Sequence, residues 1–324
     1  MSNPADKILS FLSKHKDSYT SGQAMADSLG ITRAAIWKAI ENLRADGYDI
    51  ESVKATGYKL KGVPDTLGER EILPGLKTGV LGKKIIRLTE VDSTNTYASK
   101  LAVDGEPEGT VVIAEHQTAG RGRLGRKWVS PPGLNIYASI ILRPKVPPRD
   151  APLVTFVAAV ALARTVRGLY NLDAGIKWPN DLLINGRKSA GILTEMSAEP
   201  ELVRHIILGV GIDVNMPRED FPKEIKDIST SVMLELGRKV NRAELMRRFL
   251  EELEKSYLMM VDGRRADILD EWRSLSVTLG RNVRVTSHAG EKTGFARDIN
   301  TEGGLILEVD GKEETVTSGD VGFI

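Results

Sequence analysis

The first 62 residues carry apolar positions at helical spacing and then at a strand-like period of two. Ser21 and Thr32 are placed to cap a second and a third helix, and Gly30 makes the sharp turn between them. Residues 48–60 follow as two short strands around a turn, which fits a wing. We therefore expect a winged helix-turn-helix over residues 1–62. The apolar positions of its first helix are Ile8, Leu9, Phe11 and Leu12.

The third helix of this unit would enter the major groove of DNA. Its early exposed residues Arg33 and Lys38, together with Ser21 and Thr32, are the expected DNA contacts. Basic and acidic residues nearly balance here, so one copy should bind DNA weakly, and a dimer on two half-sites would supply the missing affinity. A small three-helix domain used for protein contacts is the alternative.

Residues 63–80 hold the prolines and glycines of a linker that also packs on the next domain. Residues 81–275 mix strand and helix patterns without regular alternation, which favours an α+β domain with a mixed or antiparallel sheet over a doubly wound one. The apolar run at 152–170 predicts a buried helix, and 241–260 and 268–275 predict closing helices. The expected strands cover residues 84–89, 111–115, 135–142, 182–184, 191–196 and 205–210.

After Ser276 the pattern changes to short strands, with turns expected at 287–290, 302–304 and 310–311. A small β-barrel over residues 276–324 is predicted. The fold class is therefore α+β multidomain.

Composition narrows the chemistry. The 324 residues can bury one large core beside smaller domains, and without cysteine no thiol nucleophile, disulfide or cysteine-ligated metal is possible. His15, His116, His205 and His288 are scattered, so no protein metal site is expected. No apolar signal core opens the chain, and the run 153–163 is shorter than the roughly 20 residues of a membrane span. We expect a cytoplasmic protein with no membrane partner.

Two segments, residues 114–128 and 177–193, place guanidinium and ammonium groups on glycine-rich backbone. The basic loop should repel itself when empty and become ordered when anions arrive. Such cations suit a site that holds a nucleotide phosphate against a second anion, which is the chemistry of acyl-adenylate formation. A solvated basic surface loop is the alternative. Gln117 and Trp128 at the ends of the run argue against it, because a charge run needs neither an amide nor an indole.

Gly120, Gly122 and Gly125 also match the dinucleotide pattern G-x-G-x-x-G. That pattern requires a strand leading straight into a helix and an acidic residue roughly 20 positions further on. Residues 127–133 contain two prolines and a glycine that block a helix, and no acid lies near the required distance. We therefore reject a dinucleotide site.

These motifs resemble those of the biotin protein ligases, and in particular of the bifunctional type that is also a biotin operon repressor. The resemblance covers nearly the whole chain, and it implies a central domain like that of class II synthetases and an SH3-like C-terminal barrel. The most specific matches are Asp92-Ser93-Thr94-Asn95, Gly120-Arg121-Gly122-Arg123 with Gly125-Arg126-Lys127-Trp128, Lys177-Trp178-Pro179-Asn180-Asp181, and Lys188 with Ala190-Gly191-Ile192-Leu193.

The resemblance implies a biotin pocket lined by the Ser-Thr-Asn segment, whose hydroxyls suit the ureido oxygen of biotin, and Gln117 can both donate to and accept from a ureido group. Helix capping by Asp92 or Ser93 is the alternative for that segment. The small wall residues could equally reflect ordinary sheet packing. The expected biotin contacts are Ser93, Thr94, Asn95, Gln117, Gly120, Arg121, Gly122, Arg123, Lys188, Gly191, Leu193, Gly209 and Gly211.

The implied reaction has two steps: biotin carboxylate attacks the α-phosphorus of ATP, and a lysine of a biotin carboxyl carrier domain then attacks the mixed anhydride. Because two anions meet, cations should dominate catalysis, with Mg²⁺ bound through ATP. Lys188 should bridge carboxylate and phosphate, Arg123 should reach the phosphate, and Asp181 should lie beside the reacting centre. The expected contacts with ATP or the adenylate are Arg121, Arg123, Trp128, Asn180, Lys188, Asp213 and Asn215.

One position departs from the family pattern. This chain has Asp213 where many relatives carry the first asparagine of Gly-Ile-Asn-x-Asn, the residue that contacts adenine in that pattern. An ionised aspartate can accept a hydrogen bond from the adenine amino group but cannot donate one. The sequence leaves the nucleotide preference open.

We predict a ligase that forms biotinyl-5'-AMP and biotinylates a carrier lysine, and that also represses biotin genes. The adenylate should act as corepressor by ordering loops that favour a homodimer on operator DNA. The alternatives are a lipoate-type ligase, a ligand-sensing repressor without turnover, and an enzyme whose N-terminal domain no longer regulates. The presence of Lys188 and of the complete basic loop disfavours the second. The sequence does not determine the operator, the carrier or the dimer affinity.

Overall fold

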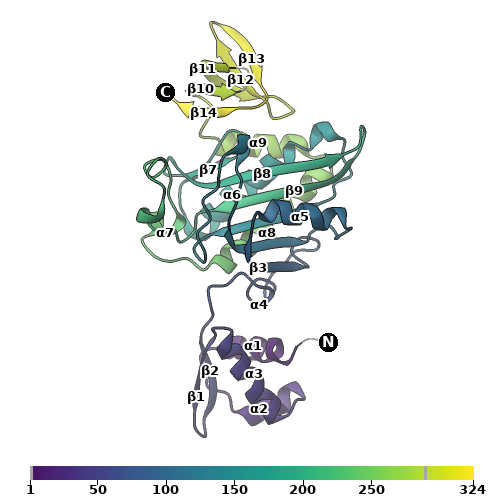
Figure 1. Ribbon diagram of the computed structural model, residues 1–324, viewed down its shortest axis with the longest axis vertical. Coiled ribbons are helices and arrows are strands. Elements are labelled where there is room, and N and C mark those ends of the chain that lie inside the picture. The colour runs from purple at the N-terminus through teal and green to yellow at the C-terminus, as the bar shows by residue number, and fades with distance from the viewer. Residues whose placement is uncertain (1–2, 288–289) are drawn as a thin grey trace. The chain divides into compact units, whose positions relative to one another are not determined.

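A computed structural model describes residues 3–287 and 290–324, and these form two compact units, one up to Thr66 and the other from Leu67 onward. The first unit has three helices, a two-stranded antiparallel hairpin and its own buried core, as expected for a winged helix-turn-helix (Figure 1). Its elements are α1 (Pro4–Lys14), α2 (Gly22–Leu29), α3 (Arg33–Ala45), β1 (Asp49–Val53) and β2 (Gly57–Gly62).

Local chemistry explains the helix boundaries of this unit. The Ser21 hydroxyl accepts from the Ala24 amide at 3.1 Å, and the Thr32 hydroxyl accepts from the Ala35 amide at 3.2 Å. Gly30 ends α2 with φ +64°, a conformation that favours glycine. The predicted caps and turn are confirmed.

The second unit is built on a seven-stranded mixed sheet in the order β3-β4-β5-β9-β8-β7-β6, in which only the β3–β4 pair is parallel. The mixed sheet was predicted, but β6 was not. The strands are β3 (Ile85–Val91), β4 (Val111–Gln117), β5 (Ile136–Leu142), β6 (Ala174–Lys177), β7 (Asp181–Ile184), β8 (Arg187–Ala198) and β9 (Val203–Ile212).

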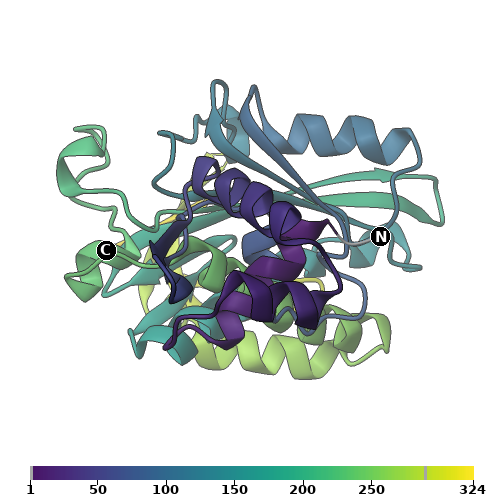
Figure 2. The same cartoon turned by 90° about the horizontal axis from the view of Figure 1, so that it is seen from below.

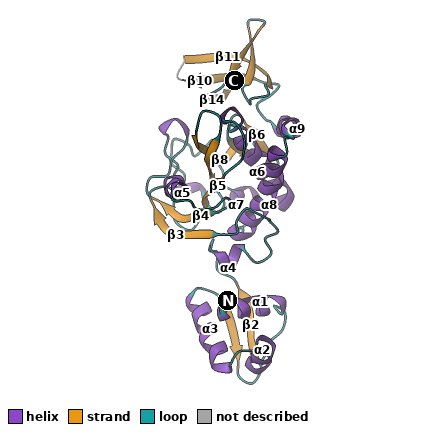
Figure 3. Cartoon of the chain, turned by 90° about the vertical axis from the view of Figure 1, so that its right-hand side faces the viewer, coloured by secondary structure: helices purple, strands orange, loops and turns teal. Residues whose placement is uncertain are grey.

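Helices cover both faces of this sheet (Figures 2 and 3). One face packs against α6, α8 and α9 in the main hydrophobic core, and the other packs against α5 through a smaller cluster that includes Ala98 and Ile207. The short helices α4 and α7 were not predicted. The helices are α4 (Glu69–Ile72), α5 (Thr94–Val103), α6 (Leu153–Tyr170), α7 (Val232–Leu236), α8 (Arg242–Val261) and α9 (Arg265–Leu275).

The predicted buried helix is α6. Within the described residues, only the stretch 148–170 is long and apolar enough to cross a bilayer, with a mean hydropathy of 1.5. Twelve of the α6 residues are buried, from Leu153 to Val166, and Arg164 forms ion pairs with Glu252 and Glu271 on α8 and α9. The apolar character of α6 is therefore explained by packing inside the protein.

The C-terminal segment forms a five-stranded antiparallel sheet in the order β13-β12-β11-β10-β14, which confirms the small β domain. It shares the main core with the central sheet, and the Trp178 indole donates to the Gly303 carbonyl at 3.0 Å. His288 and Ala289 of the expected 287–290 turn lie outside the described residues. The strands are β10 (Asn282–Ser287), β11 (Gly290–Ile299), β12 (Leu305–Val309), β13 (Lys312–Val316) and β14 (Asp320–Phe323).

Candidate active site and DNA-binding surface

A cavity of about 580 Å³ lies over β8 and β9, beneath the basic loop of residues 118–129 and beside β14. The strand register creates its floor by pairing Gly191 with Gly211 and Leu193 with Gly209. The predicted site residues that line it are Ser93, Thr94, Asn95, Gln117, Arg121, Gly122, Arg123, Trp128, Asn180, Asp181, Lys188, Gly191, Leu193, Gly209, Gly211 and Asp213.

Gly120 and Asn215, also predicted as site residues, lie outside this lining. Gly120 packs against the loop itself, because a Cβ there would lie 2.5 Å from the Trp128 carbonyl oxygen. The side-chain NH₂ of Asn215 donates to the Val240 carbonyl, and its side-chain oxygen accepts from the Val240 amide, each at 2.9 Å. The structure therefore gives Asn215 a place in chain packing rather than in the cavity wall.

The segment at the start of α5 forms one end of the cavity. Thr94 donates through its amide (2.8 Å) and its hydroxyl (3.1 Å) to the side-chain oxygen of Gln117, and the Ser139 hydroxyl links Thr94 to Asn95. The Ser93 side chain makes no capping bond. Asp92 accepts from the Ser93 amide at 2.6 Å, but the first amide of α5, that of Thr94, is bound by Gln117 instead of by Asp92 or Ser93.

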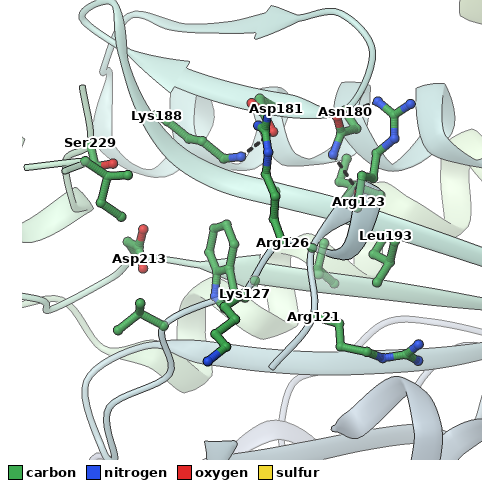
Figure 4. Close-up of a pocket in the computed structure, with 18 of the residues that line it drawn as sticks. Arg121, Arg123, Arg126, Lys127, Asn180, Asp181, Lys188, Leu193, Asp213 and Ser229 are labelled. Carbon is green, nitrogen blue, oxygen red and sulfur yellow. Dashed lines mark hydrogen bonds and ion pairs between the residues drawn. The ribbon is translucent and has the colours of Figure 1, made fainter. Parts of the chain in front are cut away.

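Charged groups of the basic loop, β7 and β8 also line the cavity (Figure 4). The Lys188 ammonium lies 2.6 Å from an Asp181 carboxylate oxygen and 5.4 Å from the centre of the Trp128 ring. A register shift between β7 and β8 pairs Leu182 with Ala190 but Leu183 with Lys188. Side chains on a regular strand alternate between faces, so this bulge puts Lys188 on the same face as Gly191.

The basic loop is held at three points. Arg121 pairs with Glu195 on β8 at 3.0 Å, Arg123 donates to the Asn180 side-chain oxygen at 3.1 Å, and Arg126 pairs with Asp320 on β14. Burial lowers the pKa of Arg123, which Asp320 and Asp181 partly oppose. The self-repulsion expected from the sequence is offset by these partners.

Trp128 lies flat against the glycines of the floor. A Cβ at Gly211 would lie 2.5 Å from its ring, and one at Gly191 would lie 3.0 Å away. The two glycines therefore make room for an aromatic wall. The Trp128 ring lies beneath Lys188, a position from which it can stack on a planar ligand.

Several residues in or near the cavity were not predicted as site residues, although one of them, Lys177, belongs to a matched motif. Burial lowers the pKa of Lys177, which lines the cavity. Glu195 and Asp320 hold the loop, and Asn135 holds Asp213 through a 3.0 Å hydrogen bond. Asp320 reaches the site from about 200 positions beyond the loop in the sequence, so no local pattern could have indicated it.

In the N-terminal unit, Arg33 and Lys38 are exposed on α3, while Ser21 and Thr32 are exposed at the N-termini of α2 and α3. The sequence reasoning missed Trp37, whose side chain is 60% exposed on α3.

The described residues contain no cluster of three or more His, Cys, Asp or Glu that could hold a metal ion.

Models of three protein families match the chain in order. They are an HTH domain over residues 5–59, the Biotin/lipoate A/B protein ligase family over residues 88–213, and the Biotin protein ligase C terminal domain over residues 278–323. The fold and the site thus define a protein ligase with a helix-turn-helix domain at its N-terminus.

Whole-chain relatives narrow this class. The chain is 41% identical to the bifunctional ligase/repressor BirA of Bacillus spizizenii over 97% of each protein, and 33% identical to that of Escherichia coli over 94% of the chain and 92% of the relative. A biotin protein ligase from Aquifex aeolicus in complex with biotin and ATP superimposes with a TM-score of 0.64 at 28% identity, over 74% of this chain and 98% of that one. The chain belongs to the family of bifunctional biotin ligase/repressors.

Proposed function

We propose that the cavity binds biotin and ATP side by side, joins them as biotinyl-5'-AMP, and then passes biotin to a lysine of a biotin carboxyl carrier domain. The observation that carries this proposal is the arrangement of Lys188, Asp181 and Trp128 under a loop that carries three arginines. Polar groups at the start of α5 suit the ureido ring of biotin, and the ammonium group of Lys188 suits its carboxylate.

In the first step, a carboxylate oxygen of biotin attacks the α-phosphorus, and the bond to the pyrophosphate leaving group breaks. Lys188 and Arg123 neutralise the two anions as they approach and stabilise charge on the phosphoryl oxygens. Mg²⁺ would arrive with the phosphates, since the described residues offer only isolated carboxylates such as Asp181 and Asp320 near them. When bound, Mg²⁺ would share the leaving-group charge.

In the second step, the neutral amine of the carrier lysine attacks the biotinyl carbonyl carbon, the bond between that carbon and the phosphate oxygen of AMP breaks, and the new amide nitrogen releases one proton. Asp181 can orient that amine, because its carboxylate already holds one ammonium group, that of Lys188. The basic loop covers the mixed anhydride and keeps water from it.

The N-terminal unit gives the enzyme its second role as a biotin-responsive repressor. Arg33, Lys38, Ser21 and Thr32 contact operator DNA, and the adenylate promotes the homodimer that spans two half-sites. This proposal is supported by the exposure of these four residues at the N-terminus of α2 and along the first half of α3, and by the whole-chain match to ligase/repressors. A cytoplasmic location and the three domain ranges 1–62, 81–275 and 276–324 remain part of it.

Exchange of labelled pyrophosphate into ATP tests the proposal directly. Biotin should support rapid exchange, and lipoate should support little or none, because a lipoate-type ligase is the rival function. Label from biotin should then appear on an added carrier domain. The proposal is overturned if lipoate supports exchange and biotin does not, or if no exchange occurs with either acid.

A further inference from the structure

Asp213 follows the last residue of β9, lines the cavity and is 6% exposed. Its backbone amide donates to the Ser189 carbonyl at 2.8 Å, so the residue is fixed in place. Among the described residues, none forms an ion pair with the carboxyl group of Asp213. The nearby Lys188 is paired with Asp181 instead. Burial therefore dominates and raises the pKa of Asp213 to about 8, an effect that Lys188 opposes only in part.

The elements packed around Asp213 bring few other charges. The phenol of Tyr137 on β5 has its pKa raised by burial and is neutral. Arg242 on α8 is buried, but it forms a 2.9 Å ion pair with Glu115 on β4. The surroundings of Asp213 thus favour the uncharged acid.

The hydrogen bonds fix where the proton of that acid must lie. The Asn135 side-chain NH₂ donates to Oδ1 of Asp213 at 3.0 Å, and the Asn135 side-chain oxygen accepts from the Val214 amide at 2.9 Å. Because both ends of the Asn135 amide are used, it cannot turn over to present its oxygen to Asp213. Oδ1 is the acceptor in this pair, and because the carbonyl oxygen of a neutral acid is the stronger acceptor, we assign the proton to Oδ2.

We propose that Asp213 is a carboxylic acid whose Oδ2–H donates to a ring nitrogen of adenine while Oδ1 accepts from the adenine amino group, so that its proton selects adenine over guanine. The inference rests on the proposed function, because it assumes that a nucleotide occupies this cavity. The neutral acid presents one donor beside one acceptor, as the amide of an asparagine does. A protonated Asp213 therefore offers the same hydrogen-bond donor and acceptor as the asparagine that many relatives carry at this position.

The chemistry of the two bases explains the selection. Adenine presents an amino donor next to the N7 acceptor, whereas guanine presents the O6 and N7 acceptors together on that edge. An ionised Asp213 has acceptors only, which match the adjacent N1–H and amino donors on the other edge of guanine. Loss of one proton therefore reverses the preference.

Affinity for ATP should consequently depend on pH in a defined direction. Below pH 8 the acid is protonated and binds adenine, and above pH 8 it ionises, so the affinity falls by up to about tenfold per pH unit until the residual affinity of the ionised form is reached. Affinity for GTP should rise over the same range. Asp213→Asn carries the same donor and acceptor without the titration.

The test measures the affinity of ATP and GTP for the wild-type chain and Asp213→Asn by titration calorimetry from about pH 6.5 to 9.5. The variant controls for the titration of ATP and of every other protein group. The ratio of wild-type to variant ATP affinity should be near one at the acid end and fall by about tenfold near pH 9. Parallel profiles for the two proteins, or loss of ATP binding in Asp213→Asn alone, overturn the inference. Failure of the wild-type chain to bind ATP at any pH overturns the proposed function.

A second measurement needs no folded variant. Ordinary aspartates ionise near pH ~3.9, so infrared spectra of the ¹³C-aspartate-labelled wild-type chain at pH 6 should retain the carbonyl band of a protonated acid, and this band should disappear as the pH rises through 8. Absence of that band at pH 6 excludes the protonated Asp213 whether or not nucleotide binds.

Discussion

The place of Lys188 depends on the bulge between β7 and β8. Without it, Lys188 would point to the sheet face opposite Gly191, because the two residues are three positions apart and side chains on a regular strand alternate between faces. The bulge aims the ammonium at Asp181 and over Trp128. The sequence thus predicted a lysine at this site, but it did not predict the face of the sheet to which the lysine side chain points.

Replacing Lys188 with Ala should reduce biotin-dependent pyrophosphate exchange by about 10²–10³-fold, the usual loss when one group that stabilises transition-state charge is removed. The side chain is 33% exposed, so the thermal stability should change little. Exchange kinetics and a melting curve measure both effects. Lys145→Ala, at an exposed position outside the cavity lining, is the matched control and should match the wild type. Normal exchange by Lys188→Ala would remove this residue from the reaction.

At the scale of elements, the basic loop and β14 are joined although they are distant in sequence. Arg126 pairs with Asp320, and Arg123 donates to the Gly319 carbonyl. Arg121 and Glu195 leave 46% and 38% of their side chains exposed, and such pairs contribute only about 0.2–1 kcal/mol. The loop is therefore held by contacts weak enough to open during turnover.

Glu195→Gln should loosen the loop without unfolding the protein. The free energy of unfolding should fall by less than about 1 kcal/mol, and bound biotinyl-5'-AMP should hydrolyse up to about fivefold faster because water reaches it more often. Denaturant unfolding and the decay of preformed adenylate measure the two effects. Glu199→Gln breaks a similar exposed pair, with Arg204 on the same sheet, and should leave adenylate decay unchanged. An equal acceleration in both variants would assign the effect to the sheet rather than to the loop.

At the scale of the whole molecule, one chain joins a helix-turn-helix unit to a ligase unit, each with its own core. Ligand binding in the cavity can affect DNA binding only if it changes the structure of a segment outside the cavity. The basic loop is the segment that contacts the cavity, β8 and β14 together. We therefore propose that adenylate promotes dimerisation through this loop.

Sedimentation should show mostly monomer without ligand and a concentration-dependent shift to dimer with biotin and ATP together. Lys188→Ala in the same mixture should remain largely monomeric, since it makes little adenylate. Synthetic adenylate should restore the dimer in that variant. If the wild type and Lys188→Ala dimerise to the same extent with and without ligand, dimerisation does not depend on the cavity.

The sequence by itself determined the elements whose signals are local. Ser21, Gly30 and Thr32 set helix boundaries through bonds to near neighbours, and the apolar run of α6 required burial. Motifs with fixed spacing named most of the cavity residues. These properties depend on contacts within a few positions, so the order of residues is enough to predict them.

Tertiary structure decided what depends on partners far along the chain. Gln117 took the capping role at α5, Asp320 reached the loop from β14, and Asn215 turned to Val240 instead of the cavity. Above all, the residue type shows only that position 213 is an acid, whereas burial in the folded chain raises its pKa to about 8. Solvation and strand register are properties of the folded arrangement, and they therefore cannot be read from the residue type alone.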